Sequence, residues 1–296
     1  MELRVLNYFL AVAREENITK AAQMLHVTQP TLSRQMMQLE EELGVKLFVR
    51  SSHSIILTED GMLLKRRAQE LLSLAEKTKR DFVRREEELT GEIAIGSGEF
   101  LSARLFSRLL YSFRQEHPLV RYQIYSGNAD NIRDYIERGL LDMGVMLEPV
   151  DIRKYDFVSI PQKEKWGVLV RTDSVFADRT SISPQELIGL PVISTSREFV
   201  QSELGDWFDE TYGRLQIVAT GNLLYNEAML AESGMGVALG IELHCTYKNL
   251  RFIPFEPVIE SSTVLAWKKD QLFPPACTEF IEYAKKYLKS ISEDKQ

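Results

Sequence analysis

Two short helical patterns lie side by side in residues 19–44, TKAAQMLHVTQPTLSRQMMQLEEELG, and only three residues separate them. Thr19 and Thr28 stand where the two helices would begin, and threonine is a favoured N-cap residue. Pro30 is tolerated in the first turn of the second helix, and Gly44 is typical of the position that ends one. Because so short a connection forces two helices to pack against each other, the stretch predicts a compact helix-turn-helix.

The second helix of this pair separates apolar residues from polar ones. The apolar residues recur at helical spacing and predict an inward stripe, formed by Leu32, Met36, Leu39 and Leu43. The opposite face offers amide, hydroxyl and guanidinium groups, which can read base edges and phosphates. Its residues are Gln29, Thr31, Ser33, Arg34 and Gln38. Thr19 and Lys20, at the start of the first helix, are placed to hold a phosphate. For the second helix alone, an ordinary solvated surface is the alternative.

Residues 47–57 follow the pair and read as strand, polar turn and strand. A hairpin after a helix-turn-helix is a wing. Arg50 and His53 lie where the tip of such a wing would meet the DNA backbone or the minor groove. The hairpin therefore favours DNA recognition over an ordinary helical surface.

A long helix is predicted next, because Thr58 can cap it and Glu59 and Asp60 suit the positive end of its dipole. Small and apolar residues then recur at alternating spacings of four and three, at Leu64, Ala68, Leu71, Ala75, Thr78 and Phe82. This heptad seam predicts a dimerisation helix, which suits a two-fold protein that reads two half-sites. Packing of the helix on its own domain is the alternative.

Strand and helix patterns alternate from Gly91 to the C-terminus in two βαβ sets, which predicts parallel sheets with helices on their faces. The loops that end the strands are small and polar and precede helices, so their free N–H groups would face a common crevice. The candidate ligand contacts in these loops are Ser97, Gly98, Glu99, Phe100, Asn128, Thr195, Ser196, Arg197 and Asn222. Arg197 suits a carboxylate or phosphate and Glu99 suits an amine, so the charge of the ligand stays open.

The net charge of −7 is unevenly spread along the chain. The first 90 residues hold equal numbers of basic and acidic side chains, so the acidic excess lies entirely in the remainder. A positive DNA-binding face would therefore have to come from the arrangement of side chains in the N-terminal part.

The bulk properties exclude other classes of protein. With 296 residues, the chain is long enough for two or three cores. We find no apolar run that could span a membrane and no secretory signal, and therefore expect a cytoplasmic protein. The two cysteines and four histidines show no ligand spacing, and no dinucleotide motif or nucleophile elbow is complete. We therefore expect no metal, no cofactor and no enzymatic activity.

Residues 3–61 resemble the winged helix-turn-helix of LysR-type transcriptional regulators, whose signature runs as FLAVAREENITKAAQMLHVTQPTLSRQMMQLEEELGVKLFVRSSHSIILTEDG does here. The resemblance implies that one set of residues faces DNA, namely Gln29, Pro30, Thr31, Ser33 and Arg34. It also implies that Thr28 and Arg50 hold phosphates. Residues 91–296 are similar, with weaker motifs, to the periplasmic-binding-protein-like effector domain of the same family. In that domain of related regulators, effectors contact the positions of the first strand-end loop, which contains Ser97, Gly98, Glu99 and Phe100. They also contact the position of Asn128.

The expected organisation has three parts: a winged helix-turn-helix DNA-binding domain at 1–58, a linker and dimerisation helix at 59–90, and an α/β effector domain at 91–296. The effector domain is expected to contain two subdomains between which the chain crosses twice. We place the first at about 91–162 together with 267–296, and the second at about 163–266.

The function implied is sequence-specific transcriptional regulation, in which a small molecule in the cleft changes DNA affinity or geometry. The expected partners are promoter double-stranded DNA, a small-molecule effector and further copies of the chain, as a homodimer or homotetramer, without a membrane. A second class stays open, in which the C-terminal part is a solute-binding or catalytic module and the N-terminal heads contact proteins. The wing and Arg34 favour the regulator.

Overall fold

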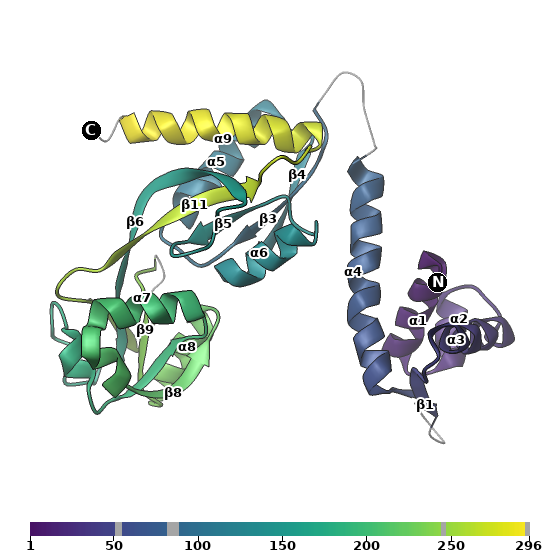
Figure 1. Ribbon diagram of the computed structural model, residues 1–296, viewed down its shortest axis with the longest axis horizontal. Coiled ribbons are helices and arrows are strands. Elements are labelled where there is room, and N and C mark those ends of the chain that lie inside the picture. Colours follow the sequence, from purple (N-terminus) through teal and green to yellow (C-terminus); the bar gives the residue numbers. More distant parts are fainter. Residues whose placement is uncertain (51–54, 82–88, 244–246, 294–296) are drawn as a thin grey trace. The chain divides into compact units, whose positions relative to one another are not determined.

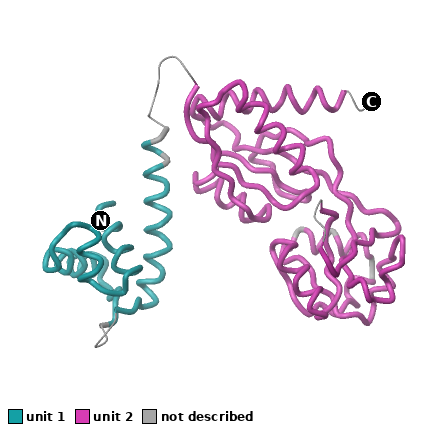
Figure 2. Tube along the Cα trace, turned by 180° about the vertical axis from the view of Figure 1, so that it is seen from behind, with its two compact units in different colours: residues 1–83 teal, residues 84–296 magenta. Residues whose placement is uncertain are grey.

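The computed structural model describes residues 1–50, 55–81, 89–243 and 247–293. The chain divides into two compact units, residues 1–83 and residues 84–296, which are coloured separately in Figure 2. Among the positions singled out above, His53 and Phe82 lie outside the described residues, as do two others with reactive side chains, His244 and Cys245.

The first unit is the predicted helix-turn-helix, hairpin and long helix (Figure 1). Its elements are α1 (Leu3–Glu15), α2 (Ile18–Met24), α3 (Gln29–Leu43), β1 (Phe48–Arg50), β2 (Ile55–Leu57) and α4 (Glu59–Asp81). Strands β1 and β2 pair antiparallel, so the predicted hairpin is confirmed.

The ends of α3 follow the predicted chemistry. The Thr28 side chain accepts a hydrogen bond from the backbone N–H of Thr31, and Pro30 lies in the first turn. Gly44 ends the helix with φ of 70°, a left-handed conformation that costs glycine little. The prediction for α2 was wrong by two residues, because the Asn17 side chain, and not Thr19, caps that helix by accepting from the N–H of Lys20.

The core of the first unit combines α1, the helix pair and part of α4. Leu32, Met36 and Leu39 of α3 are buried as predicted, whereas Leu43 is 39% exposed. Leu43 sits in the last turn of α3, so the buried stripe ends one turn earlier than predicted. Ala68 of α4 is fully buried in this same core.

The second unit contains two α/β subdomains (Figure 1). Its elements are β3 (Gly91–Ser97), α5 (Ala103–Glu116), β4 (Val120–Ser126), α6 (Ala129–Glu137), β5 (Met143–Leu147), β6 (Tyr155–Arg171), η1 (Pro184–Leu187), β7 (Pro191–Thr195), α7 (Glu198–Phe208), η2 (Asp209–Arg214), β8 (Gln216–Gly221), α8 (Leu224–Glu232), β9 (Val237–Ile241), β10 (Leu250–Pro254), β11 (Glu260–Lys268) and α9 (Pro275–Glu293). Strand β10 has no counterpart in the sequence prediction.

The sheet runs in the order β4-β3-β5-β11-β6-β9-β7-β8, and β10 pairs with β6. In the first subdomain β3, β4 and β5 are parallel to one another, and in the second β7 is parallel to β8 and β9. Strand β6 joins the two subdomains, because its first half pairs with β11 and its second half pairs with β9 and β10.

The second crossing between the subdomains comes earlier in the chain than the sequence predicts. Residues Thr263–Trp267 of β11 pair with β5, so this stretch belongs to the first subdomain and not to the second. The return therefore precedes Thr263, whereas the sequence prediction places it after residue 266. The apolar pattern of STVLAWKK identifies a strand but does not show which sheet the strand joins.

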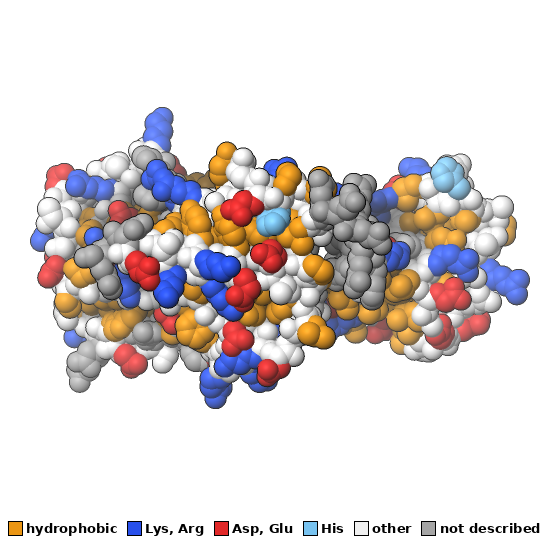
Figure 3. Space-filling view, turned by 90° about the horizontal axis from the view of Figure 1, so that it is seen from above, with side chains coloured by type: hydrophobic (Ala, Val, Ile, Leu, Met, Phe, Trp, Pro, Cys, Tyr) orange, Lys and Arg blue, Asp and Glu red, His pale blue; other side chains and the backbone are white. Residues whose placement is uncertain are grey.

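Helices cover both faces of the first subdomain, with α5 and α9 on one face and α6 on the other (Figure 1). Cys277 of α9 is buried in the former layer. On the face shown in Figure 3, acidic and basic side chains of the described residues are interspersed with apolar ones. Every described helix is too short or too polar to cross a membrane.

Candidate functional site

The outward face of α3 is the first candidate site. Gln29, Thr31, Arg34 and Gln38 are exposed and Ser33 is partly buried, while the stripe on the other side is packed into the core. Within the part of the chain that the structure describes, the Arg34 guanidinium makes no hydrogen bond or ion pair. Gln38 accepts a hydrogen bond from Gln35, at 3.1 Å. The α3 face therefore keeps a cation and several donors available to a ligand in solution.

The turn before α3 and the start of α2 add further polar groups. The hydroxyl groups of Thr28 and Thr31 are hydrogen-bonded at 2.8 Å, and this bond links the N-cap residue to the first turn of α3. Thr19 and Lys20 lie in the first turn of α2, where both side chains are exposed. Their backbone lies at the N-terminal end of that helix, where N–H groups favour an anion.

The hairpin is fixed to α3 by one carboxylate. Glu40 Oε1 accepts hydrogen bonds from the backbone N–H groups of Leu47, at 2.8 Å, and Phe48, at 3.4 Å. Glu40 Oε2 accepts from Lys46 Nζ at 2.8 Å. Burial acts to raise the pKa of Glu40, but the Lys46 and backbone hydrogen bonds outweigh it, so the pKa is lowered. Arg50 ends β1, placing its backbone where the predicted wing begins to turn.

The predicted dimer seam of α4 divides into two halves. Leu64 is partly buried against the core of the first unit, and Ala68 lies fully inside this core, so Ala68 is not available to a second chain. The reason is that α1 lies along this part of α4. Farther along, Ala75 is half-buried and Leu71 and Thr78 are exposed, together with Leu74.

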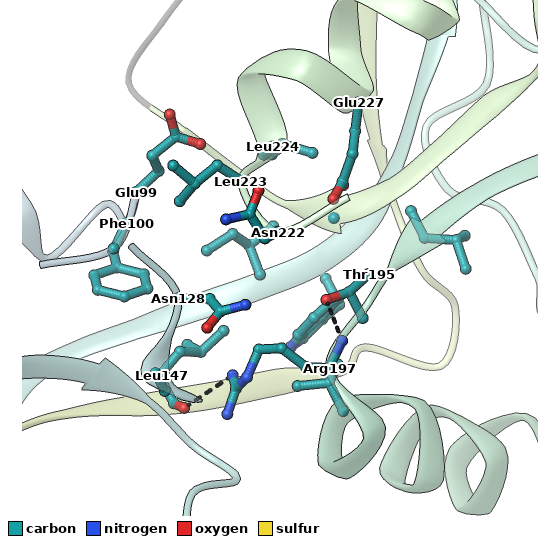
Figure 4. Close-up of a pocket in the computed structure, with 17 residues that line it drawn as sticks. Glu99, Phe100, Asn128, Leu147, Thr195, Arg197, Asn222, Leu223, Leu224 and Glu227 are labelled. Carbon is teal, nitrogen blue, oxygen red and sulfur yellow. Dashed lines mark hydrogen bonds between the residues drawn. The ribbon is translucent and has the colours of Figure 1, made fainter. Parts of the chain in front are cut away.

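The second candidate site is a cavity between the two subdomains of the second unit (Figure 4). Seven of the nine predicted contacts line it: Gly98, Glu99, Phe100, Asn128, Thr195, Arg197 and Asn222. Ser97 and Ser196 do not. All four strand-end loops contribute, because the parallel strands bring their carboxyl ends to the cleft. The polar groups of the cavity thus come from both subdomains.

Other lining residues were missed by the sequence analysis, and most of them lie inside strands or helices. They are Ala129, Leu147, Trp166, Val200, Leu223, Leu224, Glu227, Leu239, Gly240 and Ile241. Most are apolar and give the cavity a largely hydrophobic wall. Trp166 is held in place by its ring N–H, which donates to the Ser261 hydroxyl at 2.8 Å. No local signal marks these positions, since a core residue and a cavity residue have the same sequence pattern.

The loop that carries Gly98 to Phe100 is held by a buried acid from the strand that joins the subdomains. Glu164 of β6 is fully buried, and its two carboxylate oxygens accept from the N–H groups of Leu101, at 2.8 Å, and Ser102, at 2.9 Å. These N–H groups lie just before α5. Glu164 therefore couples the position of this loop to the crossing strand.

Arg197 is 5% exposed, and its guanidinium points at the opposite subdomain. It donates to the carbonyl oxygens of Pro149, at 2.7 Å, and Leu147, at 3.4 Å, and to the carboxylate of Asp130, at 3.4 Å. Figure 4 shows the side chain lying along one wall of the cavity. The sequence left open whether Arg197 would pair with an anionic ligand, and in this arrangement its guanidinium already donates to these three residues.

Two further contacts join the subdomains at the cavity. Asn222 Nδ2 donates to Asn131 Oδ1 at 3.4 Å, and the N–H of Tyr225 donates to the Glu99 carboxylate at 3.2 Å. Asn128 accepts from the N–H of Asn131 at 2.9 Å and so caps α6. With its oxygen used in the cap, the amide N–H₂ of Asn128 is left for the cavity.

Glu227 is the most unusual side chain of the cavity. It lies in α8, is 4% exposed, and extends from the helix into the cavity (Figure 4). Burial and, secondly, the charge of Glu99 raise its pKa to about 7. A carboxyl group in this state changes its charge near neutral pH. Among the described residues, no cluster of three or more His, Cys, Asp or Glu side chains could hold a metal ion.

Comparisons with known proteins assign both units. The pattern described as "Bacterial regulatory helix-turn-helix protein, lysR family" matches residues 3–62, and "LysR substrate binding domain" matches residues 86–289. The Hca operon transcriptional activator HcaR of Escherichia coli (strain K12) is 30% identical over 302 residues, or 99% of this chain and 100% of that protein. The HTH-type regulator YwbI of Bacillus subtilis (strain 168) is 28% identical over 300 residues, or 99% of each.

Solved structures agree on the fold. The crystal structure of CbnR, a LysR family transcriptional regulator, has a TM-score of 0.75 at 20% identity and covers 97% of this chain and 99% of that one. Full-length CbnR complexed with its target DNA has a TM-score of 0.73 at 20% identity and covers 97% and 100%.

A winged helix-turn-helix joined to a two-subdomain α/β unit with a cavity defines a DNA-binding regulator that responds to a small molecule. The chain belongs to the LysR family, whose two domains together span residues 3–62 and 86–289. It is a transcriptional regulator, with a DNA-binding helix-turn-helix and an effector-binding domain, and not an enzyme. The alternative of a catalytic or solute-binding module with protein-contacting heads is therefore set aside.

Proposed function

We propose that α3 enters the major groove of promoter DNA and that its outward face reads the bases. The reading set is Gln29, Pro30, Thr31, Ser33, Arg34 and Gln38. One observation carries this assignment: the polar face of α3 is exposed while its apolar stripe is packed in the core. An exposed guanidinium is suited to guanine or phosphate, and amide groups are suited to adenine.

A second set of residues would hold the sugar-phosphate backbone on either side of the groove. It comprises Thr19, Lys20, Thr28, Arg50 and His53. The position of Thr19 and Lys20 at a helix N-terminus supports their part. Arg50 belongs to the set through the family resemblance, and both Arg50 and His53 belong to it through their predicted place at the tip of the wing. Phosphate contacts fix the register of a protein on DNA, and base contacts supply the sequence preference.

The effector would bind in the cavity between the subdomains and act by changing the contacts that cross it. Arg197, Asn222 and Glu99 each link one subdomain to the other. A ligand that inserts between these groups must replace their hydrogen bonds, and so favours one closure of the subdomains over another. A ligand shifts such an equilibrium by its difference in affinity for the two states.

The chain would work as a homodimer or homotetramer in the cytoplasm, where promoter DNA is found. The half of α4 that carries Leu71 and Leu74 supports a contact with a second copy, because both leucines are exposed in a long helix.

Leu71→Asp places a charge in that contact and should reduce the assembly to a smaller species. Light scattering at matched concentrations measures the mass, with Asn7→Asp, at an exposed position of α1, as the control. A parent mass for Leu71→Asp would remove Leu71 from the contact.

The function is tested by selection of genomic fragments with the purified full-length protein at two salt concentrations. A shared, roughly palindromic site whose retention falls steeply with salt is expected, because each phosphate contact releases counterions. Repeating the selection with pooled metabolites identifies fractions that change binding. If the folded protein enriches no site under any of these conditions, the assignment of α3 is wrong.

A further inference from the structure

Carboxyl groups outnumber cations among the ionisable side chains that the described residues place in the cavity. Among the described residues that line it, these groups are Glu99, Arg197 and Glu227. Arg197 is paired with Asp130 and donates to two backbone carbonyls, so its charge is already compensated. Glu99 accepts one backbone hydrogen bond, from the N–H of Tyr225. The two carboxyl groups are therefore the charges that a ligand would meet.

Glu227 lacks a partner although it is buried. Its side chain is 4% exposed, and within the described part of the chain its carboxyl group has no hydrogen bond or ion pair. A buried, unpaired carboxyl group is costly unless a ligand or a proton satisfies it. The Glu227 side chain points into the cavity in Figure 4, and a ligand in the cavity would supply the missing donor.

The Glu227 carboxyl group packs closely against Gly221 of β8. A methyl group added to the Cα of Gly221 would lie 2.5 Å from Glu227 Oε1, so a larger residue there would require the Glu227 side chain to shift. Gly221 is adjacent to Asn222, whose amide crosses to the other subdomain. The Glu227 carboxyl group therefore lies beside the segment that carries the Asn222 contact between the subdomains.

Most of the remaining lining is apolar, and the space is small. Leu147, Trp166 and Ile241 belong to this wall. The cavity has a volume of about 80 Å³, whereas an engineered cavity that admits benzene measures about 150 Å³. A compact aliphatic group fits such a space better than a ring, unless the subdomains move apart.

We propose that the cavity selects a small ligand with a protonated amine, which sits between Glu99 and Glu227 while its aliphatic part lies against the apolar wall. This proposal rests on the proposed function, since it names the chemical class of the effector. The raised pKa of Glu227 agrees with it, because a cation would stabilise the ionised form that burial and Glu99 now disfavour. An anionic ligand would meet two carboxyl groups and an arginine that is already occupied.

Three probes of nearly equal shape test the charge preference on the full-length wild-type protein: isobutylamine, isobutanol and isobutyrate. Ligand-observed NMR titration at about pH 8 keeps the amine protonated and favours the ionised form of Glu227. We expect the amine to bind about 10-fold to 100-fold more tightly than the alcohol, as a charge-assisted hydrogen bond predicts, and isobutyrate to bind weakest. Equal binding of amine and alcohol, tighter binding of isobutyrate, or no binding of the amine overturns the proposal.

Glutamine substitutions then locate the preference. Glu227→Gln and Glu99→Gln keep the size of each side chain and remove its charge, so each should reduce the preference for the amine about tenfold or more. Glu279→Gln, at an exposed position of α9, is the control and should leave the preference unchanged. Circular dichroism confirms folding, and an amine preference that survives in both folded variants refutes the assignment. If Glu227→Gln does not fold, Glu99→Gln decides.

The same preparations are tested for retention of a specific DNA site. A wild-type protein that selects a site but ignores the amine leaves the proposed function intact and refutes only the ligand class. A protein that binds the amine but selects no DNA site, with or without the amine, refutes the proposed function instead. The two failures are therefore distinguishable.

Discussion

The two units use the same residue type in opposite ways. Arg34 of the first unit is exposed and has no partner among the described residues, whereas Arg197 of the second is 5% exposed and donates to both carbonyl and carboxylate oxygens. A surface that must bind DNA keeps its donors in water until the partner arrives. A cavity that links two subdomains uses its donors to hold one arrangement, so a ligand has to compete with the protein itself.

The difference also concerns how each unit is stabilised. The first unit has one core, shared by its helices and the hairpin, and its functional groups lie outside that core. The second unit has separate cores in its two subdomains, and its polar cavity lies where these subdomains meet. Changes to the core of the first unit should therefore act on stability, while changes to the cavity act on the closure of the second unit.

The largest effect is expected from Leu39→Ala, which empties part of the core of the first unit. Leu39 is 1% exposed, and deletion of a buried leucine side chain costs about 2–5 kcal/mol. Because the units are compact by themselves, thermal unfolding should show a lower midpoint for the first unit only. Hydrogen exchange measured on peptides from each unit reports the unfolding of the first unit and of the second unit separately. Equal loss of protection in the second unit would mean that the units unfold together.

A smaller effect is expected from Arg197→Ala, which leaves the carbonyl groups of Leu147 and Pro149 without this donor. The cost to the stability of the second unit should be about 1–3 kcal/mol, as for other buried groups that lose a partner. Hydrogen exchange at the N-terminal end of α6 should increase. Lys163→Ala, at an exposed position of β6 away from the cavity, is the control. Unchanged exchange in Arg197→Ala would show that the bridge contributes little to closure.

Arg34→Ala should weaken DNA binding and leave the stability of the first unit unchanged. Loss of one base or phosphate contact weakens specific binding by about 1–3 kcal/mol. Fluorescence anisotropy with the selected site measures this effect, and a melting curve verifies that the fold is intact. Arg4→Ala on α1, where the arginine pairs with Glu2, is the matched control. Equal affinity of Arg34→Ala and the wild type for the site would exclude Arg34 from the interface.

The smallest effect is expected from Glu40→Gln, which weakens the link between α3 and the hairpin by about 1 kcal/mol at neutral pH. The pKa of Glu40 is lowered in the folded protein, so its ionised form stabilises the fold above the ordinary value of 4.5. That stabilisation is lost as the pH falls through the folded-state pKa. The unfolding free energies of wild type and variant should converge in acid. A constant difference down to the lowest pH at which both fold would contradict the ionic account.

Local patterns predicted most of the first unit. The cap at Thr28, the glycine at position 44 and the hairpin all depend on residues a few positions apart, and the structure has each of them. The errors are local as well: Asn17 caps α2 in place of Thr19, and Leu43 is exposed. Both are boundary positions, where neighbouring residues compete and the pattern gives little guidance.

The sequence by itself determined the family, the order of most helices and strands, and the four loops that meet at the cavity. It did so because caps, periodicity and turns act over short stretches of chain. Only the tertiary structure decided that α1 covers Ala68, that the Arg197 guanidinium already donates to groups of the other subdomain, and that Glu227 enters the cavity. Each of these depends on contact between segments far apart in the chain, because burial and the partners of a polar group are set by what packs beside it.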